Sequence, residues 1–224
     1  MRVLWTIVIL LLGPIAGFFG GRKLRQVPPR KLIYVSNAIN LVVLAAITAA
    51  IDLTHGRKAF SLLVSVGALR PLAMWSAATA ALCIAIAAVT LSVRMVLRRS
   101  PKPSVIALLP RNASEKLAFI LLCVLIAAVE EFMYRGFALS ALREWLRSGT
   151  LAAALVSLSF AFMHGLQDWV AIVAAFVQGV VLTVPVFLVH SLVPSIAGHF
   201  VVDVCAGLLL LKALQRLRLV PDET

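Results

Sequence analysis

Two adjacent glutamates form the strongest candidate for chemistry in this sequence. Glu130 and Glu131 follow thirteen apolar residues, 117–129, so a helix through this run carries both carboxylates to membrane depth. Inserting a charged side chain at that depth costs about 2.5 to 3.5 kcal/mol of free energy on membrane-insertion scales. A charged residue found there is therefore taken as a candidate functional residue. The pair is therefore a candidate site within a membrane.

The two glutamates differ in their expected partners. Arg135 lies four residues after Glu131 on the same helical face, and an ion pair between them would satisfy Glu131 as a carboxylate. Glu130 lies about 100° around the helix and has no such partner. Burial disfavours the charged form of the Glu130 carboxylate, so this group binds a proton more readily than an exposed glutamate. A general base that works near neutral pH requires this property. We expect Glu130 to be the base and Glu131 and Arg135 to support it.

Two histidines on later apolar stretches extend this set. Phe160 precedes His164 by four residues, so its ring lies on the same helical face and can restrict the imidazole. His199 and Asp203 share that spacing, which lets the aspartate accept from one ring nitrogen and fix the tautomer or stabilise a cation. With Glu130, these side chains provide a base, two imidazoles and an orienting acid. Such a set can activate a water and hold an oxyanion.

The motifs follow one another in a fixed order: Glu-Glu-x-x-x-Arg, then Phe-x-x-x-His, then His-x-x-x-Asp. In this order they resemble the CAAX prenyl protease and bacteriocin-processing family (CPBP, or Abi) of intramembrane proteases, over about residues 115–210. The resemblance implies an all-helical membrane peptidase in which Glu130 and His164 activate the attacking water. It also implies that His199 and Asp203 stabilise the oxyanion.

The third motif departs from the pattern of the eukaryotic prenyl proteases, which carry Asn at the position of Asp203. An ionised aspartate cannot donate to an oxyanion. We therefore expect Asp203 to orient His199 unless it is protonated, and a prenylated substrate is left open.

Two mechanisms are compatible with the resemblance, because the family has been described both as metalloproteases and as glutamate-type proteases without metal. The sequence lacks H-E-x-x-H, but a zinc site could be built from Glu130, His164 and His199. The expected pairing of Arg135 and the lack of further carboxylates favour the metal-free mechanism. We therefore expect no cofactor, with zinc as the alternative.

Composition requires that these residues lie on membrane helices. Hydrophobic residues make up 62% of the chain and charged residues 13%, whereas about a quarter of the residues of soluble domains are charged. A helix needs about 20 residues to cross the hydrocarbon core. Stretches of about this length are 3–19, 32–51, 72–93, 169–189 and 192–211.

Two shorter apolar runs, 117–129 and 151–163, become spans only if the polar residues that follow them also enter the membrane. The predicted fold is therefore all-α, a polytopic transmembrane helix bundle of about seven spans. The run 59–69 is too short to span and is expected to be re-entrant or interfacial.

The sequence divides into three parts. Residues 1–112 form N-terminal transmembrane spans separated by basic loops, and nothing in them indicates chemistry. Residues 113–212 form the catalytic helix bundle, and 213–224 form a basic polar tail.

The net charge of +12 does not indicate nucleic-acid binding, because the basic residues gather at span ends without interleaved aromatics. Clusters occupy the first loop, the segment after the third span and the segment after the last span. With seven spans, these three clusters all lie on one side of the membrane. Since Lys and Arg are retained on the cytoplasmic side, we expect the C-terminus to be cytoplasmic. We expect a multi-pass protein of the cell membrane with lipids as partners.

Helix geometry gives one expected contact and one difficulty. If the chain turns at 148–150, Glu130 and His164 both lie some ~20 to 27 Å from the turn, which predicts contact between them. His199 lies only a few residues after its own turn, so equal depth requires a broken or tilted helix. The candidate breakers are Pro185 and Pro194.

The function that these residues favour is an intramembrane endopeptidase cleaving a membrane-associated or lipidated peptide or protein. One rival is a non-catalytic membrane immunity or scaffold protein that keeps the polar residues for assembly. Another is a proton-coupled transporter, because chains of acids and histidines also relay protons.

Overall fold

The computed structural model describes the chain except residues 20–28, 66, 100–102, 107, 165–167 and 217–224. Every element of the described part is a helix, which agrees with the all-α prediction. The helices are α1 (Arg2–Phe19), α2 (Arg30–Thr54), α3 (Lys58–Val64), α4 (Leu69–Val96), α5 (Pro103–Ile106), α6 (Ala113–Glu131), the π-helix η1 (Phe132–Ala138), α7 (Leu139–Leu146), α8 (Gly149–Met163), α9 (Trp169–Val189) and α10 (Val193–Arg216). From residue 217 onward, the predicted basic tail lies outside the described residues.

The helices account for the predicted membrane spans. Four are long and apolar enough to cross a membrane, namely Arg30–Thr54, Leu69–Val96, Ala113–Leu146 and Trp169–Val189. Three shorter apolar helices, Arg2–Ile15, Gly149–Met163 and Val193–Leu209, coincide with the other predicted spans. Many large hydrophobic side chains face outward from the bundle, where lipid would cover them. The chain is a multi-pass membrane protein built as a polytopic helix bundle.

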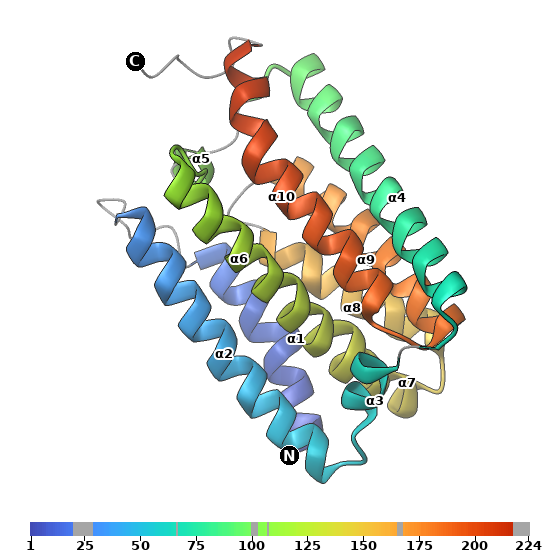
Figure 1. The fold of residues 1–224 in the computed structure, drawn as a ribbon. Helices are drawn as coiled ribbons and strands as arrows, with labels where there is room; N and C mark the ends of the chain where they lie inside the picture. Colours follow the sequence, from blue (N-terminus) through green and yellow to red (C-terminus); the bar gives the residue numbers. More distant parts are fainter. Residues whose placement is uncertain (20–28, 66, 100–102, 107, 165–167, 217–224) are drawn as a thin grey trace.

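Helix α10 is central to the packing. It contacts α4, α6 and α9, while α8 packs between α1 and α9 (Figure 1). The N-terminus, α3 and α7 lie at one end of the bundle, and α5 and the C-terminal end of α10 lie at the other (Figure 1). The N-terminal spans therefore pack directly on the helices that carry the candidate site.

The glutamates lie inside one continuous helical run. Helix α6 begins at Asn112, whose side chain accepts from the Glu115 amide, and continues through η1 into α7 without a loop. The polar residues after 117–129 thus enter the span, as predicted. The intervening π-helix was not predicted, and all seven of its residues are buried. Such widened turns are rare and are frequently found at functional sites.

The short helix α3 overlaps the piece 59–69 that was expected to be re-entrant or interfacial. The buried carboxylate of Asp52 accepts from the amides of Ala59 and Phe60 and so holds the first turn of α3. A Cβ added at Gly136 of η1 would lie 3.0 Å from the Cβ of Ala59. Helix α3 therefore packs closely against the π-helix through two small residues.

The turn between α9 and α10 is buried against α3. Ser191 and Leu192 are fully shielded, and the Leu192 amide donates to the Leu62 carbonyl at 3.0 Å. The Ser191 hydroxyl donates to the Ser65 carbonyl at 2.7 Å. The first turn of α10 therefore starts inside the bundle, which brings His199 to the depth of the glutamates.

The sequence predicted a broken or tilted helix near His199, and the break is absent at both proline candidates. Helix α9 continues through Pro185 to Val189, and Pro194 lies in the first turn of α10, where its missing N–H has no helical partner to lose. The broken helix was the wrong one of these two alternatives, because the turn before α10 is buried inside the bundle. The tilted helix stays a prediction.

Close packing of α10 on α4 gives a test of the fold. A Cβ at Gly198 would lie 2.7 Å from the Cγ2 of Thr79, so Gly198→Val should push the helices apart. We expect a loss of about 1 to 3 kcal/mol in the free energy of unfolding, measured by denaturant titration in detergent micelles. Gly67→Val is the control, because nothing lies within 4 Å of a Cβ there. Equal stability of Gly198→Val and the wild type would contradict this packing.

Candidate active site

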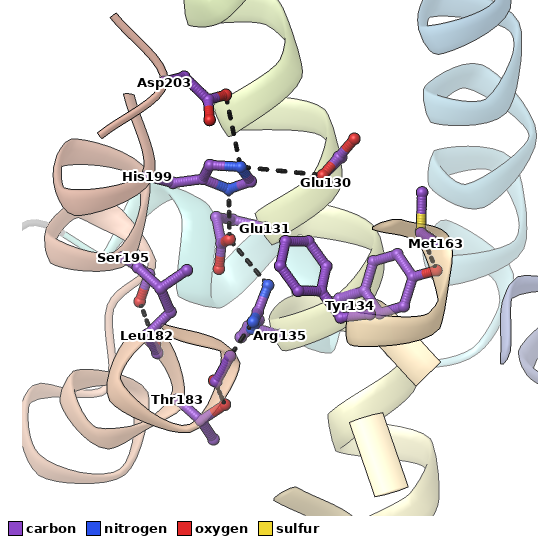
Figure 2. Close-up of polar contacts among 12 residues, drawn as sticks. Glu130, Glu131, Tyr134, Arg135, Met163, Leu182, Thr183, Ser195, His199 and Asp203 are labelled. Carbon is purple, nitrogen blue, oxygen red and sulfur yellow. Dashed lines mark hydrogen bonds and ion pairs between the residues drawn. The ribbon is translucent and has the colours of Figure 1, made fainter. Parts of the chain in front are cut away.

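A single imidazole lies among three carboxylates at the junction of α6, η1 and α10. His199 is buried, and its Nδ1 lies 2.8 Å from Glu131 Oε1. Its Nε2 lies 3.9 Å from Glu130 Oε2 and 3.5 Å from Asp203 Oδ2. Figure 2 shows these contacts around the ring. The structure therefore brings together four of the residues singled out in the sequence.

The predicted ion pair between Glu131 and Arg135 is present. Arg135 Nη1 donates to Glu131 Oε1 at 2.8 Å, and both side chains are completely shielded from solvent. Arg135 Nη2 also donates to the Gly179 carbonyl at 3.2 Å, which links η1 to α9. A buried pair of this kind requires such additional hydrogen bonds to offset its desolvation.

Glu131 has a second role that its sequence spacing does not indicate. Its Oε1 accepts from both Arg135 and the His199 ring (Figure 2). An ion-paired carboxylate can only accept, so the hydrogen lies on Nδ1 of His199. Glu131 therefore makes the orienting hydrogen bond that was expected of Asp203, which stands farther from the opposite ring nitrogen. No local spacing signals this contact, because Glu131 and His199 lie 68 residues apart in the chain.

Phe160 joins the polar groups through its ring. Its centroid lies 5.2 Å from that of His164, which agrees with the predicted contact, and 5.6 Å from that of His199 in an edge-to-face arrangement. The Arg135 guanidinium carbon lies 4.4 Å from the centroid, a favourable cation–π geometry. Phe160 thus shields one side of the ion pair and contacts both imidazoles.

The expected direct contact between Glu130 and His164 is absent. The Nδ1 of His164 donates to the Phe160 carbonyl at 3.1 Å, while Glu130 makes its closest polar approach to His199. His164 is only partly buried, and the Glu130 side chain is 17% exposed. Equal depth along the helices was therefore not sufficient to predict contact. Both side chains keep polar atoms without a protein partner in the described part of the chain.

A cavity adjoins this cluster. It has a volume of about 360 Å³, lies among α4, α9 and α10, and includes His164 and Asp203 in its wall. Most of the lining is apolar and small, with Arg94 and Gln178 as further polar members. The cavity can accept an apolar chain beside the two polar side chains.

The alternative zinc site fits the arrangement poorly. Within the described ranges, no group of three or more His, Cys, Asp and Glu side chains is arranged to hold a metal ion. The three predicted ligands Glu130, His164 and His199 therefore do not form such a group among the residues that the structure describes.

The buried ion pair gives a test of the site's architecture. Arg135→Met leaves a carboxylate buried without its charge partner, which should cost about 3 to 5 kcal/mol in the free energy of unfolding. The double variant Glu131→Gln/Arg135→Met removes that uncompensated charge and should be less destabilised than Arg135→Met alone. Denaturant titration in detergent micelles measures both. A double variant that is less stable than Arg135→Met would contradict the pairing.

Comparison with known proteins identifies the segment that carries the site. A family model described as type II CAAX prenyl endopeptidase Rce1-like matches residues 112–205, which include all three motifs from Glu130 to Asp203. No curated protein and no solved structure matches the chain. The match confirms the resemblance to the CPBP family over residues 112–205, the segment that carries the candidate site.

Proposed function

We propose that this protein is an intramembrane endopeptidase that hydrolyses a peptide bond of a membrane-associated or lipidated peptide or protein. The observation that carries the proposal is the buried His199, whose Nδ1 is bound by ion-paired Glu131 while its Nε2 faces Glu130 and Asp203. The Nε2 of His199 is thus oriented towards two carboxylates that are not part of the Glu131–Arg135 ion pair. The adjoining cavity provides space for a substrate.

In the proposed mechanism, Glu130 and His164 bind one water between them. The Nδ1 of His164 donates to its own helix, so the neutral ring has Nε2 available as an acceptor. Glu130 takes a proton from the water as the water oxygen attacks the scissile carbonyl carbon. The same proton then passes to the leaving amine as the carbon–nitrogen bond breaks.

His199 is the proposed oxyanion donor. Since Nδ1 donates to Glu131, the second ring nitrogen donates to the developing oxyanion when it is protonated. Asp203, 3.5 Å from that nitrogen, would favour the protonated ring by its charge. This assignment gives Asp203 an electrostatic role and does not require it to donate, which an ionised carboxylate cannot do.

The proposed substrate carries an apolar segment or lipid near the scissile bond. The cavity beside His164 and Asp203 is lined mainly by small apolar side chains, which would accept aliphatic residues or a lipid chain. Internally quenched peptides ending in Cys-aliphatic-aliphatic-X, with and without a farnesyl group, distinguish these two possibilities.

We also propose that the protein lies in the cell membrane with its C-terminus in the cytoplasm. Helix α4 ends at the same end of the bundle as α5 and the C-terminal end of α10 (Figure 1), and Arg98 and Arg99 follow α4 in the chain. Retention of basic residues on the cytoplasmic side supports this orientation.

Removing the proposed base tests the function. In purified protein reconstituted into liposomes, Glu130→Gln should lower cleavage of the quenched peptides by about 10²- to 10⁴-fold, because the amide cannot accept the proton. The matched control is Glu115→Gln in the first turn of the same helix, which should retain activity. Full processing by both Glu130→Gln and His164→Ala would contradict the mechanism. A transporter would instead give proton flux without cleavage, and an immunity protein carrying Glu130→Gln would still protect cells.

Metal dependence provides a separate test. A metal-free mechanism predicts that dialysis against a chelator leaves the cleavage rate unchanged and that the purified protein contains much less than one equivalent of zinc. Elemental analysis and the rate should be measured on the same sample. Stoichiometric zinc together with loss of activity in chelator would overturn the metal-free mechanism.

A further inference from the structure

We propose that Gln178 binds the peptide backbone of the substrate beside the scissile bond, an inference that rests on the endopeptidase function proposed above. Gln178 lies on α9, in the wall of the cavity that His164 and Asp203 also line. The α9 residues of this wall share one helical face, and they are Ala171, Ala174, Ala175 and Gln178. A single carboxamide therefore follows three small apolar side chains along the cavity.

The hydrogen-bonding groups of Gln178 are available to a ligand. Its partly buried carboxamide makes no hydrogen bond with the part of the chain that the structure describes. Other polar side chains of the cavity wall already have partners. Thr90 Oγ1 donates to the Ile86 carbonyl at 2.7 Å, and both terminal nitrogens of Arg94 donate to Asp168. Since an unpaired carboxamide in apolar surroundings costs free energy, a ligand that pairs with Gln178 gains affinity.

The backbone beside Gln178 is held firmly. The carbonyl of the next residue, Gly179, accepts from Arg135 Nη2 at 3.2 Å, which ties this turn of α9 to the buried ion pair. A Cβ added at Gly179 would lie 3.0 Å from the Cβ of Ser157, so α9 packs closely on α8 at the same point. The side chain of Gln178 therefore starts from a fixed position relative to the candidate active site.

Gln178 lies at about the depth of His199. The Ser195 hydroxyl donates to the Leu182 carbonyl at 2.7 Å, which fixes the level at which α10 passes α9. Gln178 precedes Leu182 by four residues, and His199 follows Ser195 by the same number. At a rise of about 1.5 Å per residue, both lie about 6 Å farther from the turn that joins the two helices. A peptide group bound to Gln178 would thus lie near the level of the proposed oxyanion donor.

The ligand class that fits Gln178 is an extended apolar peptide. A peptide segment that leaves its helical conformation in a membrane has N–H and C=O groups without partners, and each costs free energy there. A carboxamide can donate to a peptide carbonyl and accept from a peptide N–H at once. The small side chains of Ala171, Ala174 and Ala175 allow a backbone to come close.

Steady-state kinetics on the unmodified quenched peptides in liposomes test this role. Gln178→Leu removes both the donor and the acceptor at similar size and should raise KM by about 10-fold. The value of kcat should be unchanged, because the bonds hold the bound substrate and the transition state equally. A role in holding the attacking water is the competing explanation, and it predicts a lowered kcat instead.

The matched control is Thr90→Val in the same cavity. Because the Thr90 hydroxyl already donates to its own helix, we expect this variant to keep the KM and kcat of the wild type. Values of kcat are divided by the folded fraction, determined from unfolding curves. KM is a property of the active fraction, so partial unfolding of Gln178→Leu would not change it.

A second series of peptides identifies the bound group. In each peptide, one amide other than the scissile one is replaced by an ester, which removes an N–H donor. One of these esters should raise KM for the wild type and for Thr90→Val. The same ester should have no further effect in Gln178→Leu, since the partner of the missing N–H is already absent.

Three results would overturn the assignment of Gln178 to backbone binding. The first is an unchanged KM in Gln178→Leu. The second is a lowered kcat with unchanged KM, which would assign Gln178 to the chemical step. The third is a set of ester effects that are all as large in Gln178→Leu as in the wild type. With Glu130→Gln inactive, each of them leaves the proposed function standing, whereas activity retained by Glu130→Gln would contradict the proposed function itself.

Discussion

The buried ion pair between Glu131 and Arg135 is the interaction on which the site depends. A carboxylate with no exposed surface is tolerated only with a charge partner and further hydrogen bonds. Arg135 provides the charge, the Gly179 carbonyl satisfies a second guanidinium nitrogen, and the Phe160 ring covers one face. The position of Glu131 in turn fixes the His199 ring. One ionic contact therefore connects η1, α8, α9 and α10.

The surrounding helices hold this ion pair in place through close packing at small residues and through hydrogen bonds to the backbone. Asp52 holds the first turn of α3, and α3 packs on the π-helix where Gly136 removes any side chain. The same short helix accepts the amide of Leu192 and so holds the beginning of α10. A helix that starts inside the bundle can present His199 to the middle of α6. The N-terminal spans, in which the sequence indicated no chemistry, thus position the site.

Local patterns in the sequence predicted what depends on local spacing. Apolar runs predicted the spans, and i,i+4 spacing predicted the contacts of Glu131 with Arg135 and of Phe160 with His164. The sequence did not predict the π-helix or the bond between Glu131 and His199, because both arise from packing between distant segments. The prediction of a direct contact between Glu130 and His164 was wrong, because the depth of a residue along a helix does not fix the direction of its side chain.

A double-mutant cycle on unfolding free energies tests whether Glu131 holds His199 through a buried hydrogen bond. Glu131→Gln, His199→Gln and the double variant would be unfolded by denaturant in the same detergent micelles. The hydrogen bond between Glu131 and His199 should give a coupling energy of about 0.5 to 3 kcal/mol, as found for residues in one hydrogen-bond network. Additive effects, with a coupling energy near zero, would contradict this bond.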